Sequence, residues 1–404
     1  MTKGQKVLLD LLSSSLFDKK IKILEADWDE VLQEAKSQSV VQIAYSALDF
    51  NKMKPEEISH WREASFTNLA QNIRVIHDHA LLNKWIDGQR IPYVILKGCA
   101  SAAYYPVPTF RTMGDVDFLV SIKDLKHAGE ILEKQGLKSW EQEHEAHIVF
   151  LDEKKSNVNA TFEMHFRVAG IPGREAGALI EEYLADIFQK SESIIINGGQ
   201  IKVPSSFHHG IIILIHTCHH LTGEGIGLRH LCDWAVFENS FSNEEFREMF
   251  ENKLKAVGLW EFAKILTRTA INYLGADERE WATCDERICE SLIEDILHGG
   301  NFGKKDGSRT IQKMLISDRG KHGVGKTSMS FQFVRSANAI VMHRWPKARN
   351  NPFILVGGWL YFGSQRIVRE LTGKRQKTNV PSVIDNAAKR REIYKQMHLY
   401  ETED

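Results

Sequence analysis

Residues 114–120, GDVDFLV, decide the fold of the central part of this 404-residue chain. Two aspartates, Asp115 and Asp117, stand two positions apart at the start of an apolar run, a pattern typical of a half-buried β-strand. Because side chains alternate along a strand, the aspartates share one face, while Val116 and Phe118 share the other. Adjacent carboxylates repel each other unless a cation lies between them, and Mg²⁺ prefers carboxylate oxygens. The segment therefore predicts a strand whose polar face binds magnesium.

A second segment, residues 161–167 (TFEMHFR), alternates polar and apolar side chains and places Glu163 on the same face as His165. If this strand lies beside the aspartate strand, Glu163 supplies a third carboxylate. Three acids can hold two Mg²⁺ ions for an in-line displacement at phosphorus. In that arrangement Asp115 and Asp117 bind both ions. Glu163 binds the ion that activates the acceptor hydroxyl and could act as its general base.

The segment upstream of the aspartates has the features of a phosphate-binding turn. Residues 93–98 (YVILKG) predict a strand that ends in Lys97 and Gly98, and the small residues 99–103 can begin a helix. Such a turn presents free backbone N–H groups to phosphate oxygens, and Lys97 adds a positive charge. Arg111 could clamp a further phosphate through two nitrogens. Each motif alone has a commoner structural explanation, but their order along the chain favours one shared phosphate and metal site.

The period of the apolar residues divides the chain into three regions. Residues 1–88 and 206–404 show mainly the helical period, whereas residues 89–205 mix predicted strands and helices. We therefore predict a helical N-terminal region, an α/β domain and a mainly helical C-terminal domain. The strands are predicted within residues 91–98, 114–122, 147–153, 160–168 and 193–203, and the intervening helices at residues 100–105 and 123–135.

The composition is that of a globular chain, with 43% hydrophobic and 26% charged residues. The formal net charge of −1 provides no global attraction to nucleic acid or anionic lipid. Five cysteines without a Cys-x-x-Cys pair indicate neither a disulfide framework nor a cysteine zinc site. The N-terminus lacks a secretory signal, and the most apolar stretch, residues 352–363, is shorter than the about 20 residues of a membrane span. We expect a cytoplasmic protein without a membrane span, with residues 352–363 forming a buried helix.

One further motif matches a known nucleotide-binding pattern. Residues 320–327, GKHGVGKT, satisfy the Walker A pattern, which cradles phosphates between a strand and a helix. Only a short apolar run precedes the motif, and the chain that follows has the helical period. Residues 299–328 are instead predicted to form a long Gly- and Lys-rich loop. A flexible loop is the favoured interpretation, with a phosphate site as the alternative.

Three features of the C-terminal region have both a structural and a functional interpretation. His216 and His220 have a spacing compatible with zinc, but no acid stands at metalloprotease spacing, so a buried, hydrogen-bonded His216 is favoured. Arg229 and Asp233 are four residues apart, which favours a helical ion pair over a nucleotide contact. Aromatic and basic residues within 344–369 could dock nucleic acid or a membrane, but aromatic side chains in a helix are usually part of the core.

Together these residues resemble a known family. The chain is similar to the uncharacterised nucleotidyltransferase family within the DNA polymerase β-like superfamily. The resemblance continues into the following helices, at His216, Arg229 and Asp233, and into an aromatic and basic stretch near the C-terminus. The segments that carry it are residues 96–106 (LKG and a small-residue helix), Arg111, residues 115–120 (DVDFLV), residues 162–166 (FEMHF), residues 228–229 and residues 344–366.

The resemblance implies an α+β fold in which a small mixed β-sheet is flanked by helices. It also implies transfer of a nucleoside monophosphate from an NTP to an acceptor hydroxyl, with release of pyrophosphate. Asp115, Asp117 and Glu163 would be the catalytic and metal-binding residues, with Mg²⁺, two ions expected, as cofactor and NTP as substrate. Lys97 and Gly98 stand where most members of the superfamily have Gly-Ser.

The acceptor, the particular NTP and the oligomeric state are left open by the resemblance. A small molecule, a sugar, a protein side chain or an RNA end could each receive the nucleotide. One alternative is a toxin-like transferase that modifies protein or tRNA. Another is a catalytically inert nucleotide-binding or scaffold protein with the same fold, which three intact acids disfavour.

Overall fold

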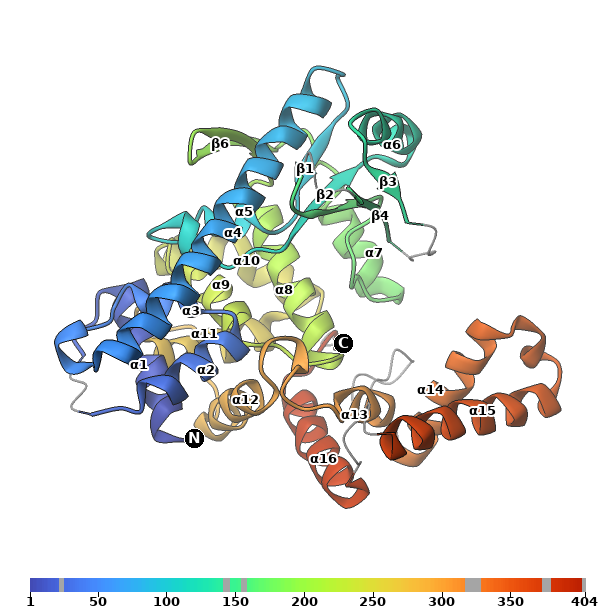
Figure 1. Cartoon of the computed structure of the whole chain (residues 1–404). Coiled ribbons are helices and arrows are strands. Elements are labelled where there is room, and N and C mark those ends of the chain that lie inside the picture. Colours follow the sequence, from blue (N-terminus) through green and yellow to red (C-terminus); the bar gives the residue numbers. More distant parts are fainter. Residues whose placement is uncertain (22–24, 141–145, 154–157, 317–327, 373–378, 402–404) are drawn as a thin grey trace.

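The computed structural model describes residues 1–21, 25–140, 146–153, 158–316, 328–372 and 379–401. Within these residues, a five-stranded mixed sheet lies to one side of a larger group of helices, and a separate pair of strands forms a hairpin (Figure 1). The predicted α+β fold, with a small mixed sheet and helical regions on both sides of it in the sequence, is confirmed.

The five-stranded sheet has the order β1-β2-β5-β4-β3. Strands β2 and β5 are parallel, with Asp117 opposite Glu163, and the other neighbours are antiparallel. Four strands lie within predicted segments, whereas the two-residue β3 is too short to show a period. The strands are β1 (Tyr93–Ile95), β2 (Asp115–Val120), β3 (Lys138–Ser139), β4 (His147–Leu151) and β5 (Thr161–His165).

Two helices, α4 (Pro55–Asp87) and α6 (Leu125–Lys134), pack on the apolar face of this sheet. Phe118 of β2 and Phe162 of β5 are fully buried there, and the Trp85 ring of α4 lies 5.8 Å from that of Phe162. A one-residue slip of β2 would turn its aspartates into this core, so burial of the apolar face fixes the register. The opposite face of β2 and β5 is left for polar side chains.

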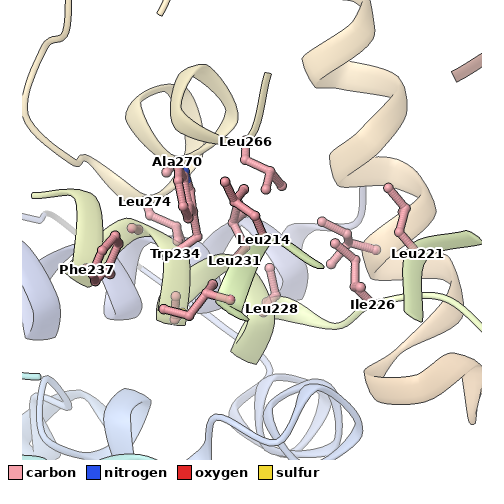
Figure 2. Packing of buried hydrophobic residues seen from close by; sticks show 14 of the residues in the cluster. Leu214, Leu221, Ile226, Leu228, Leu231, Trp234, Phe237, Leu266, Ala270 and Leu274 are labelled. Atoms are coloured by element: carbon pink, nitrogen blue, oxygen red, sulfur yellow. The ribbon is translucent and has the colours of Figure 1, made fainter. Parts of the chain in front are cut away.

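A larger, helical core lies beside the sheet. Figure 2 shows Leu214 of α8, Trp234 of α9 and Leu266 of α11 packed together in it. The N-terminal helices contribute to the same core, so the predicted boundaries at residues 88 and 205 stay predictions. Its helices include α1 (Lys3–Phe17), α2 (Trp28–Gln38), α3 (Val41–Tyr45), α8 (Ser206–Thr222), α9 (Leu228–Glu238), α10 (Asn243–Ala256), α11 (Trp260–Leu274) and α12 (Glu286–Gly299).

The predicted strand at residues 193–203 is a hairpin of two strands, β6 (Glu192–Ile196) and β7 (Gly199–Val203). Asn197 and Gly198 form its turn with φ of 49° and 77°. Positive φ at both turn positions matches the right-handed twist of the two strands, and Asn-Gly is the preferred pair for such a turn. The hairpin packs on α4 and does not join the main sheet.

The prediction of one long loop at residues 299–328 is wrong for part of that stretch, because α13 (Arg309–Ile316) is a helix. Its buried side chains include Arg309 and Gln312, which Asp295 and Asp306 hold by an ion pair and a hydrogen bond. Polar residues on its buried face obscured the helical pattern. The Walker A match at residues 320–327 lies outside the described residues.

The helix predicted at residues 352–363 exists as part of α15 (Pro352–Leu371), but its predicted burial is wrong. Phe353 is 86% exposed and Leu360 is 70% exposed. Helix α15 packs mainly on α14 (Met329–Arg344), and the two extend away from the rest of the chain, whereas α16 (Val380–Gln396) lies against α13 (Figure 1). In the described part of the chain, no helix combines the length and apolarity needed to cross a bilayer.

Candidate active site

Asp117 is the most enclosed acid on the polar face of the sheet, with its side chain only 7% exposed. Its Oδ1 atom lies 2.8 Å from Lys97 Nζ and 3.1 Å from His165 Nε2. Although burial opposes ionisation, Lys97 and His165 hold the pKa of Asp117 well below its usual range. The buried carboxylate is therefore charged and is balanced by two basic side chains, one from the turn after β1 and one from β5.

Two more carboxylates lie on the same face. Parallel pairing places Glu163 of β5 opposite Asp117, and Asp115 precedes Asp117 by two residues on β2. Asp115 reaches solvent, yet partial burial and the negative charges of Asp117 and Glu163 raise its pKa to about 6, against the opposing effect of Lys97. The three acids therefore lie within electrostatic reach of one another. A cation bound between them would relieve their repulsion.

Lys97 and Gly98 form the predicted turn after β1. Gly98 has φ +59°, and a Cβ atom there would lie 2.8 Å from His79 Nε2 of α4, so only glycine fits this close approach. The following helix, α5 (Cys99–Ala102), has only four residues, so its helix dipole is small. Lys97 contacts Asp117, so its charge lies at the acids.

Arg111, predicted to clamp a phosphate, has a close partner within the protein. Its Nε and Nη2 atoms each donate a 2.7 Å hydrogen bond to the carboxylate of Asp233 in α9. The Tyr105 hydroxyl donates to the same carboxylate at 2.7 Å. Asp233 was predicted to pair with Arg229 along the helix, but its close ionic partner is Arg111. This pair ties the segment before β2 to the helical core.

Arg229 remains available on the side of the acids. Its Nη1 atom donates one 3.3 Å hydrogen bond to the Thr112 carbonyl, and its guanidinium lies 5.3 Å from the centre of the Phe302 ring. Its buried Nε atom has no hydrogen-bond partner among the residues that the structure describes. The positive charge of Arg229 acts to lower the pKa of Asp115, so the two side chains interact across the space between α9 and β2.

Three histidines form a neutral cluster near Arg229. The rings of His216 and His220 are 4.4 Å apart, and His230 lies 5.8 Å from His216 and 5.7 Å from His220. Burial lowers the pKa of His220 to about 3 and that of His216 and His230 well below their usual value. These imidazoles are therefore uncharged at neutral pH.

Another histidine pair lies on the sheet itself. Antiparallel pairing of β4 and β5 places His147 opposite His165, and their ring centres are 4.8 Å apart. Donor atoms of His147, Glu163 and His165 all lie within 4.8 Å of one another. The sequence analysis missed His147, although it begins a predicted strand, because only the pairing of β4 with β5 shows which residues it faces.

Fold and site together define a class: an α+β protein that carries three acids on the polar face of a small mixed sheet. The model of the uncharacterised nucleotidyltransferase family matches residues 25–275, more than half of the chain, so the chain belongs to this family. A comparison with curated proteins and one with solved structures gave no match. The resemblance found in the sequence is confirmed, and the chain is a nucleotidyltransferase.

Proposed function

We propose that this chain transfers a nucleoside monophosphate from an NTP to an acceptor hydroxyl, with Mg²⁺ ions held by Asp115, Asp117 and Glu163. The parallel pairing of β2 and β5, which brings three carboxylates to one face, is the observation that carries this proposal. Carboxylate oxygens are the ligands that Mg²⁺ takes from proteins, so the donor set fits the ion. The negative charges of these acids repel one another, and packing alone does not explain why they share one face.

The chemistry at this site would be an in-line displacement at the α-phosphorus. The acceptor oxygen forms a new bond to that phosphorus, the bond to the β-phosphate oxygen breaks, and pyrophosphate leaves with the bonding electrons. Glu163 would take the acceptor proton, and its greater accessibility than that of Asp117 supports this role. When bound, two Mg²⁺ ions would supply charge neutralisation and orient the two oxygens.

We assign the phosphate contacts to Lys97, Gly98 and Arg229. Arg229 replaces Arg111 in this role, because two nitrogens of the Arg111 guanidinium already donate to Asp233. In the described part of the chain Arg229 makes a single hydrogen bond, of 3.3 Å. Guanidinium groups bind phosphate through paired N–H donors, and a buried unpartnered Nε is costly unless a ligand accepts from it. A nucleotide phosphate bound between Arg229 and a metal ion on Asp115 would accept hydrogen bonds from paired N–H donors of Arg229, including its unpartnered Nε.

Transfer of label from α-³²P-NTP tests the proposal. Purified protein, a cell lysate and each NTP are combined with Mg²⁺ or with a chelator. We expect metal-dependent labelling that E163Q and D117N reduce about 10²-fold or more. The control E133Q makes the same amide change at an exposed position on α6 and should leave labelling intact. Labelled protein or tRNA would identify the toxin-like alternative, and labelled small molecules or sugars a metabolic acceptor.

The opposite result is equally informative. If no NTP binds in a metal-dependent way and D117N changes nothing, the transferase proposal should be abandoned in favour of an inert scaffold protein.

A further inference from the structure

We infer that His147, Glu163 and His165 form a binding site for one divalent transition metal ion. The three side chains come from adjacent strands, β4 and β5, and project from the same face as Asp117. Glu163 Oε2 lies 3.6 Å from His165 Nε2 and 3.9 Å from His147 Nε2. Both imidazoles thus present a nitrogen to one carboxylate oxygen.

The spacing of these donor atoms is close to that around a bound ion. Two ligands that each lie about 2.1 Å from a metal ion in tetrahedral geometry are about 3.4 Å apart. The two distances to Glu163 Oε2, 3.6 and 3.9 Å, exceed this value by no more than about half an ångström. A small rotation of the half-buried His147 and Glu163 side chains would therefore bring the three donors to one ion without any change in the strands.

In the group of His147, Glu163 and His165, one side chain is held in a buried position and the other two can be reached from solvent. His165 is only 3% exposed, and its Nε2 atom lies near Asp117 Oδ1 (3.1 Å) as well as near Glu163 Oε2, so an ion bound to this nitrogen would replace its contact with Asp117. His147 and Glu163 are 19% and 25% exposed, so an ion can reach the donors from solvent. Antiparallel pairing sets His147 opposite His165, which keeps the two rings together.

The donor set determines the kind of ion. Imidazole nitrogen suits Zn²⁺, Fe²⁺ and their neighbours among the first-row metals, whereas Mg²⁺ prefers oxygen ligands. We therefore assign this site to a transition metal ion rather than to Mg²⁺. The inference rests on the proposed function for the role of the ion, which would take the place of the Mg²⁺ ion assigned there to Glu163, next to the acceptor. Binding of the ion itself can be measured without a nucleotide.

Co²⁺ provides a direct probe, because its visible absorption reports nitrogen and oxygen ligands. The full chain is freed of metal with a chelator, titrated with Co²⁺, and then with Zn²⁺ in competition. We expect one equivalent to bind without NTP and in the presence of millimolar Mg²⁺. H147A should weaken binding at least tenfold. The matched control H127A changes an exposed histidine of α6 and should leave the affinity and the spectrum unchanged.

Three results would overturn the inference: absence of Co²⁺ and Zn²⁺ binding, equal binding by H147A and wild type, or loss of binding in H220A with H147A unaffected. The last would place the ion at the His216, His220 and His230 cluster. Circular dichroism of each variant checks that the fold is retained. If Co²⁺ binds but no nucleotide is transferred, the proposed function fails and the metal site stands. If Mg²⁺-dependent transfer occurs but Co²⁺ does not bind, the metal site fails and the proposed function stands.

Discussion

The ion pair of Arg111 and Asp233 provides the sharpest test of how the site is supported. Their side chains are only 6% and 10% exposed, and two 2.7 Å hydrogen bonds join them. In R111M the carboxylate of Asp233 would stay buried without its partner, a change that costs about 3–5 kcal/mol in other proteins. Tyr105 still donates one hydrogen bond to that carboxylate, so we expect R111M to lower the free energy of unfolding by about 3 kcal/mol, the low end of that range.

Urea denaturation followed by circular dichroism measures this effect. With an m-value of about 3 kcal/mol/M, R111M should lower the midpoint by about 1 M. R111M/D233L should recover most of that loss, because replacing both buried charges by apolar groups is often neutral. The control R247M breaks an exposed ion pair with Glu251 and should cost less than about 1 kcal/mol. If R111M is as stable as R247M but no longer binds NTP, Arg111 is a phosphate clamp and our structural reasoning is refuted.

Three further predictions concern other parts of the site and its support. Gly98→Ala should lower stability by about 1–3 kcal/mol in the same denaturation assay, because φ is +59° and His79 leaves no room for a Cβ; unchanged stability would contradict this geometry. Arg229→Met should weaken NTP binding about 10- to 100-fold in calorimetry while R247M leaves it intact, and equal affinities would exclude a phosphate contact. Burial lowers the pKa of His209 to about 3, so below pH about 6.5 the unfolded chain binds a proton that the folded chain does not. The contribution of His209 to stability should therefore fall by up to about 1.4 kcal/mol per pH unit as the pH drops below that value, in addition to the contributions of the buried His216, His220 and His230. H209F should reduce the total slope by up to that amount between pH about 6.5 and about 5.

Local patterns in the sequence predicted the elements of the site well. The alternation in residues 114–120 and 161–167 identified β2 and β5 and the faces of their side chains, because a period of two depends only on neighbouring residues. The same patterns placed Asp115, Asp117 and Glu163 on polar faces. Strand pairing, which joins residues far apart in the chain, was only an assumption at that stage.

Other features depended on contacts that no local pattern records. The exposure of Phe353 on α15 reflects which helices lie nearby, since an apolar helix looks the same in sequence whether or not the core covers it. The helix α13 was obscured because long-range partners bury its polar residues, Arg309 among them.

The sequence by itself determined four of the five strands of the sheet, the polar and apolar faces of β2 and β5, the family and the acids of the proposed site. Only the tertiary structure decided which side chains meet. It paired Arg111 with Asp233, which lies 122 residues away, left Arg229 beside Asp115, and set His147 opposite His165 next to Glu163. The physical reason is that a side chain's direction follows from its own strand or helix, whereas its partner follows from how those elements pack.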